Sequence, residues 1–190
     1  SQPLSSKLPT LSKYLKANQE LLCVILQIPP IDPSTSLRIT FLLRLTGDVL
    51  NSVPGYPPEP NVLPDLLGFL DDLDQAWVTV LQSQIWDPRT GEPKDLEVPA
   101  DSVIADPELK STPINQTERT RLRSLLVSGT TALEEWLGGM ETEGNEEYQE
   151  ALERLGLQQG FDDLFARTLE DMGALGGSVL LPEPMEICTA

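Results

Sequence analysis

The stretch VLPDLLGFLDDLDQAWVTVLQSQIW, residues 62–86, decides the fold class of this chain. Its large apolar side chains recur at steps of three and four residues, a spacing that places them on one face of an α-helix. They are Leu63, Leu66, Leu67, Leu70, Leu73, Trp77, Val80 and Leu81. Asp74 interrupts the pattern, because a rotation of about 100° per residue turns it into the apolar stripe. The stretch therefore predicts a long core helix that carries one carboxylate on its apolar face.

Three other long segments share this periodicity and predict further helices. They begin near residues 12, 36 and 117, and each is followed by a helix-ending pair, Pro29–Pro30, Pro54–Gly55 or Gly138–Gly139. Two shorter segments, 145–155 and 161–172, have apolar positions at helical spacing among many acidic residues. Together these patterns predict an all-α fold, an irregular and largely antiparallel bundle of five or six helices.

The predicted domain organisation is one helical domain over residues 1–172, followed by a flexible tail over 173–190. Residues 87–116 contain five prolines and no sustained periodicity, which predicts a long proline-rich loop that opens with a tight turn at 87–91. Residues 145–172 are expected to form an acidic pair of short helices that pack on the body of the domain or on a partner.

The charge of this chain restricts its partners. The net charge is −17, and it is uneven: residues 1–60 carry five basic and four acidic side chains, whereas residues 61–190 carry eight basic and twenty-six acidic ones. Such a surface repels phosphate groups, so direct binding to nucleic acid or to an anionic membrane is not expected. Protein partners with basic surfaces are favoured, although acidity also serves solubility alone.

The residue types present leave little room for catalysis. The chain has no histidine and only two cysteines, Cys23 and Cys188, which are far apart. Histidine-dependent catalytic triads and the usual zinc sites are therefore excluded, and no phosphate-binding or dinucleotide-binding glycine motif occurs. We expect no cofactor and no bound metal. The remaining candidate is the cluster Asp71, Asp72 and Asp74, because paired carboxylates can hold Mg²⁺ or share a proton.

The location predicted for this protein is intracellular, either cytoplasmic or nuclear. A secreted disulfide-stabilised protein of this kind would use more cysteines. No basic-then-apolar leader opens the chain, and no run approaches the roughly 18 apolar residues of a membrane span.

Seven residues are candidates for contact with a partner. Arg119 and Arg123 lie one helical turn apart in the only basic cluster and could dock an acidic motif, although pairing with local acids is the commoner outcome. The others are apolar residues in segments without helical periodicity, Val103 and Ile104 in the proline-rich loop and Val179, Leu180 and Leu181 in the tail. We expect such segments to order on a partner.

Three polar residues are predicted to be buried. Asn18 lies in the middle of an apolar helical face and needs hydrogen-bond partners there. Arg38 projects near the apolar face of the second helix, and Asp74 near that of the third. Two alternatives stay open for Asp74: it meets Arg38, or it lies at the edge of its stripe and reaches water.

The predicted function is a non-enzymatic protein–protein interaction module, a subunit or adaptor of a multiprotein complex. The long apolar helices, the proline-rich loop and the apolar tail favour this interpretation. One alternative is an acidic chaperone or escort of a basic client, such as a histone or a ribosomal protein. A second is a carboxylate-based metal-dependent enzyme that uses Asp71, Asp72 and Asp74.

Overall fold

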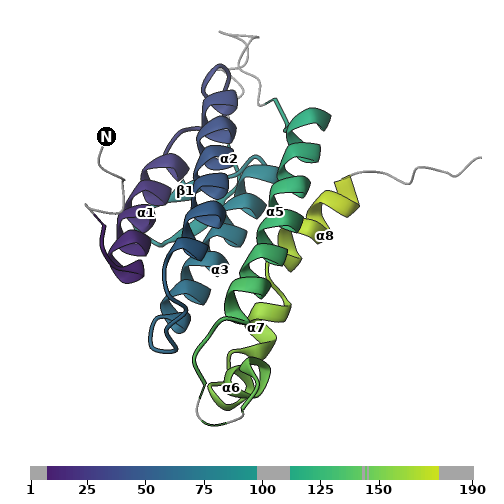
Figure 1. Ribbon diagram of the computed structural model, residues 1–190. Helices are drawn as coiled ribbons and strands as arrows, with labels where there is room; N and C mark the ends of the chain where they lie inside the picture. The colour runs from purple at the N-terminus through teal and green to yellow at the C-terminus, as the bar shows by residue number, and fades with distance from the viewer. Residues whose placement is uncertain (1–7, 98–111, 143, 145, 176–190) are drawn as a thin grey trace, which may run out of the picture.

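The helix predicted around residues 62–86 lies at the centre of the fold. The computed structural model describes residues 8–97, 112–142, 144 and 146–175, and in it α3 (Leu63–Leu81) contacts α1, α2 and α8 (Figure 1). Its apolar stripe is buried apart from Leu67, which is half-buried; Leu66, Leu73 and Trp77 are completely enclosed. The indole Nε1 of Trp77 donates to Thr46 Oγ1 of α2 at 3.0 Å, so even the polar atom of this large side chain has a buried partner.

The first two helices form an antiparallel pair beside α3. The helix α1 (Leu11–Leu26) begins at the cap residue Thr10, whose side chain accepts from Lys13 N, and α2 (Ser34–Ser52) returns along it. Tyr14 Oη donates to the carbonyl oxygen of Asp48 at 3.2 Å and fixes how the two helices lie against each other. A short 3₁₀ turn, η2 (Val53–Gly55), ends α2 at the predicted Pro–Gly pair.

The chain leaves α3 earlier than predicted and forms a small hairpin. The helix ends at Leu81, Ser83 adopts a positive φ of 53°, and β1 (Ile85–Asp87) pairs antiparallel with β2 (Glu92–Lys94). Two predictions were therefore wrong in part. Residues 62–86 are not helical throughout, and residues 87–116 are not irregular throughout. Ile85 and Trp86 extend the apolar run of the helix, but they are half-buried in the strand. The predicted tight turn is confirmed, since Gly91 N donates to Asp87 O at 2.8 Å.

The helix α5 (Gln116–Leu137) packs against α2 and begins one residue before the predicted start. Its cap is Asn115, whose side chain accepts from Glu118 N while the Glu118 carboxylate accepts from Asn115 N, a complete capping box. Gly129 lets the two helices approach closely: a Cβ atom added there would lie 2.4 Å from Leu50 Cδ1 of α2. The central glycine of the apolar stripe is thus a point of close helix contact.

Three short helices follow and cover one side of the bundle. They are α6 (Tyr148–Arg154), α7 (Gln158–Asp162) and α8 (Ala166–Leu175). The single helix predicted over 161–172 is wrong, because Phe165 adopts a left-handed φ of 58° and separates α7 from α8. Phe165 is itself buried, so the contacts of its ring offset the cost of this backbone conformation.

The all-α prediction is confirmed, with the hairpin as its one departure among the described residues. In Figure 1 α2 and α5 lie side by side, α1 flanks α2, and α8 lies beside α3 behind α5, with α6 and α7 at one end. No helix in the described part of the chain is long and apolar enough to cross a membrane.

Candidate functional site

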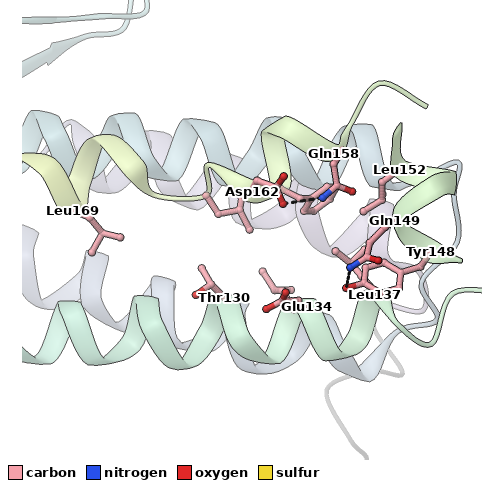
Figure 2. A pocket seen from close by; sticks show the side chains of 12 residues that line it. Thr130, Glu134, Leu137, Tyr148, Gln149, Leu152, Gln158, Asp162 and Leu169 are labelled. Atoms are coloured by element: carbon pink, nitrogen blue, oxygen red, sulfur yellow. Dashed lines mark hydrogen bonds between the residues drawn. The ribbon is translucent and has the colours of Figure 1, made fainter. Parts of the chain in front are cut away.

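A hollow that two distant parts of the sequence form together lies between α5 and the segment from α6 to α8. It has a volume of about 390 Å³ and opens to solvent (Figure 2). Its lining comes from two parts of the sequence, α5 on one side and the α6–α8 segment on the other. The lining residues are Thr130, Leu133, Glu134, Leu137, Tyr148, Gln149, Leu152, Gln158, Phe161, Asp162, Leu164 and Leu169. We refer to this hollow as the α5–α8 cleft.

The wall formed by the α6–α8 segment is fixed to the core through Asp74. This carboxylate is buried and accepts from Thr168 N at 2.9 Å and from Thr168 Oγ1. Its second oxygen accepts from Arg167 Nε at 3.1 Å. Arg167 also pairs with Asp71, which is exposed. One buried carboxylate on α3 therefore holds the first turn of α8 in place.

These contacts also shift the pKa of the Arg167 side chain. Partial burial lowers the Arg167 pKa, but the carboxylates of Asp74 and Asp71 outweigh it, so the pKa of this guanidinium is raised above its usual value. The prediction that Asp74 lies inside the apolar stripe is confirmed, and the alternative that it reaches water at the edge is wrong.

The proposed pairing of Asp74 with Arg38 was also wrong. Arg38 is fully buried, but its Nη1 donates to the carbonyl oxygen of Gln84 at 2.7 Å, where the chain enters the hairpin. Its Nε has no hydrogen-bond partner among the described residues, and neither does the buried Thr35 Oγ1 one turn earlier. Burial lowers the pKa of Arg38 to about 10. The two charged groups therefore have different partners: Arg38 binds the chain just after α3, and Asp74 binds α8.

The third residue predicted to be buried, Asn18, is half-buried. Its Nδ2 donates to the carbonyl oxygen of Tyr14 at 2.8 Å, one turn earlier in α1. The amide is therefore partnered within its own helix and does not link α1 to a neighbour through this bond.

The opposite wall of the cleft is the carboxyl-terminal half of α5. The helix is anchored to the body by Trp136, whose Nε1 donates to the carbonyl oxygen of Tyr56 at 2.7 Å. Leu133 and Leu137 turn toward the cleft side, and Glu134 lies on the same wall, exposed to solvent. In Figure 2, Thr130 and Glu134 project from α5 toward the strip that carries Asp162 and Leu169.

The cleft lining carries negative charge and no positive charge. Glu134 and Asp162 each contribute a carboxylate, and no lysine or arginine is among the residues that line the cleft. Gln158 Nε2 already donates to Asp162 Oδ1 at 2.8 Å. The carbonyl oxygen of the same side chain, Gln158 Oε1, is buried without a hydrogen-bond partner among the described residues. Between these acceptors lie the apolar walls of Leu133, Leu164 and Leu169, so the cleft fits a side chain that combines an apolar stem with a cationic end.

The predicted partner-binding residues lie outside this cleft. Arg119 is half-buried and Arg123 is exposed near the start of α5, and neither forms an ion pair with a described residue. Val103, Ile104, Val179, Leu180 and Leu181 lie outside the described residues. Their role as partner contacts stays a prediction. Glu134, Gln158 and Asp162 were not among the residues predicted to form a site.

The carboxylates of α3 are engaged in structural contacts. Asp74 and Asp71 hold Arg167, while Asp72 accepts from Gln19 Nε2 of α1 at 3.0 Å and its pKa is raised by partial burial. Within the described ranges, no group of three or more acidic or cysteine side chains is placed to hold a metal ion. The enzyme alternative stays a prediction without a site to support it.

Comparison with known proteins returned no relative: no family model, no curated protein and no solved structure matches this chain.

Proposed function

We propose that this protein is a non-enzymatic interaction module, a subunit or adaptor that holds a basic segment of a partner protein in the α5–α8 cleft. The observation that carries the proposal is the composition of the cleft lining: two carboxylates and an unpartnered amide oxygen beside apolar side chains, with no cationic side chain. A lysine or arginine of a partner supplies the positive charge that this lining lacks, and its apolar stem can pack against the apolar side chains of the cleft.

The net charge of the chain supports the same class of partner. Residues 61–190, which include both walls of the cleft, carry an excess of eighteen acidic side chains. A field of this sign attracts basic segments and accelerates their association. The affinity itself is expected to come from the few side chains that enter the cleft, because a small number of buried anchors dominates most interfaces.

The proposal is tested by capture from native extract with three immobilised proteins. They are the unmodified chain, a cleft variant with Glu134→Gln and Asp162→Asn, and a control variant with Glu59→Gln and Asp65→Asn. Glu59 and Asp65 are exposed, so the control makes the same change in net charge away from the cleft. We expect one partner to be retained stoichiometrically by the unmodified chain and the control, and lost from the cleft variant. Equal retention by all three would contradict the proposal.

The acidic chaperone is the second candidate, and the charge of −17 favours it. The two candidates differ in their response to salt. A chaperone that attracts histones or ribosomal proteins through its overall charge loses them when salt screens exposed charges over about 10 Å or less. A partner anchored between the apolar walls of the cleft is retained through a high-salt wash. Loss of every captured protein at high salt would favour the chaperone.

A further inference from the structure

A second surface carries exposed apolar side chains. It lies on α1 and α2, which do not line the α5–α8 cleft. We infer that the solvent-facing side of the α1–α2 pair is a contact between two copies of this chain. Four large apolar residues are exposed there, Leu21 (48%) and Val24 (61%) on α1 and Leu37 (47%) and Phe41 (47%) on α2. We refer to them as the α1–α2 patch. Contiguous exposed apolar side chains of this size are typical of interaction surfaces.

The antiparallel arrangement of α1 and α2 makes these four residues neighbours. Tyr14 of α1 donates to the carbonyl oxygen of Asp48 of α2, so these two positions lie side by side. Seven residues are about two helical turns and return to the same face of a helix. Counting seven residues forward from Tyr14 and seven back from Asp48 places Leu21 beside Phe41. Val24 follows Leu21 by three residues and Leu37 precedes Phe41 by four, so both lie about one turn further along the same pair of helices.

The distribution of charge points to a second copy as the occupant. Residues 61–190 carry twenty-six acidic and eight basic side chains, so two copies repel each other when they approach through those parts of the surface. The α1–α2 pair carries exposed charges of both signs around the patch, Lys13 and Glu20 on α1 and Arg44 and Asp48 on α2. A contact here keeps the acidic parts of the two molecules apart.

A two-fold arrangement suits this patch. In a symmetric dimer the same surface faces itself, and a residue on α1 of one copy meets a residue on α2 of the other. Phe41 can then pack against Leu21 and Val24 of the second copy, which leaves no exposed aromatic ring.

The size of the surface predicts a weak dimer. With helices of 16 and 19 residues, a rise of about 1.5 Å per residue and a diameter of about 10 Å, the exposed side of the pair covers on the order of 500 Å². A standard stable interface buries about 800 Å² on each partner. We therefore expect a monomer–dimer equilibrium with a dissociation constant in the micromolar range, and not an obligate dimer.

Analytical ultracentrifugation of the purified chain tests the inference, over concentrations from about 1 µM to about 1 mM. Two matched variants are compared, Val24→Asp in the patch and Val127→Asp on α5, where the valine is 55% exposed. Both introduce one carboxylate at a valine that is mostly exposed, so both are expected to fold, which circular dichroism checks. We expect the unmodified chain and Val127→Asp to dimerise alike, and Val24→Asp to dimerise at least tenfold more weakly.

Three results would overturn the inference. One is a monomer at every concentration, which would assign the patch to a different protein or to another part of the same chain. Another is an equal effect of the two variants. The third is a dimer that weakens when salt is raised, since screening the repulsion between two acidic copies must strengthen an apolar contact. This experiment uses the purified chain alone, so its outcome does not depend on whether a basic partner occupies the α5–α8 cleft.

Discussion

At the scale of single residues, two buried charged side chains, Asp74 of α3 and Arg38 of α2, differ in their hydrogen-bond partners. Asp74 has a cation, a backbone amide and a hydroxyl within hydrogen-bond distance, whereas Arg38 has one backbone carbonyl among the described residues. Burying a charge is costly, and only good partners offset that cost. We therefore expect the two residues to respond to substitution in opposite directions.

Asp74 is predicted to be required for stability. Asp74→Ala leaves the buried amide and hydroxyl of Thr168 without their acceptor and removes one partner of the partly exposed Arg167, and we expect the free energy of unfolding to fall by about 1–3 kcal/mol. Asp71→Ala removes the exposed partner of the same guanidinium and is expected to cost less than about 1 kcal/mol. Chemical denaturation of both variants measures the difference. Equal effects would contradict the assignment of Asp74 as the residue that fixes α8.

Arg38 is predicted to be dispensable for stability. Arg38→Met fills a similar volume without a buried charge, and it removes one hydrogen bond, which Arg38 donates to the carbonyl oxygen of the half-exposed Gln84. We expect the free energy of unfolding to rise by about 1 kcal/mol, as is common when an apolar side chain replaces a buried ion that has poor partners. A loss of more than about 2 kcal/mol would show that the guanidinium has an anionic partner in the native protein.

At the scale of elements, the periodicity of apolar residues was enough to predict the long helices but not the points at which they end. Ile85 and Trp86 continue the apolar run of α3, and only the pairing of β1 with β2, which depends on residues further along, shows that they leave the helix. The break at Phe165 has the same origin, since a phenylalanine with a positive φ carries no local sequence signal. The partners of Asp74 were missed because Arg167 and Thr168 lie more than ninety residues away along the chain.

The contact between α2 and α5 predicts opposite effects for two glycine substitutions. Alanine is favoured over glycine by about 1 kcal/mol inside a helix. At Gly68 of α3 an added Cβ meets nothing within 4 Å, so Gly68→Ala is expected to raise the free energy of unfolding. At Gly129 it would lie 2.4 Å from Leu50, and we expect Gly129→Ala to lower it by about 1–3 kcal/mol despite the better helix propensity. Thermal denaturation of the two variants measures both effects. Stabilisation by both substitutions would contradict the close contact between Gly129 and Leu50.

The hairpin predicts a dependence of stability on pH. Asp87 accepts from Lys94 Nζ and from the backbone amide of Arg89, and these bonds hold its pKa well below the usual range. A lowered folded-state pKa contributes stability above the unfolded value of about 3.9, and this contribution is lost as the pH falls toward the folded value. Asp87→Asn should therefore be less stable than the unmodified chain at pH 7, and the difference should shrink below about pH 4. Melting temperatures at both pH values measure it, and a difference that stays constant would contradict the ion pair.

At the scale of the whole molecule, the cleft results from how separate elements are brought together. One wall belongs to α5, which is held by its contact with α2, and the other to α7 and α8, which are held by α3. No motif in the sequence marks Glu134, Gln158 and Asp162 as neighbours. The acidic balance of residues 61–190 favours a basic partner, but it does not predict where on the molecule such a partner would bind.

The most direct test of the central claim is hydrogen–deuterium exchange of the chain with and without the captured partner. The short helices α6 and α7 have few turns and are expected to open readily in the free protein, so their amides report binding sensitively. We predict slower exchange in residues 148–162 and in the second half of α5 when the partner is bound. Protection confined to other elements, with these residues unchanged, would contradict the α5–α8 cleft as the binding site.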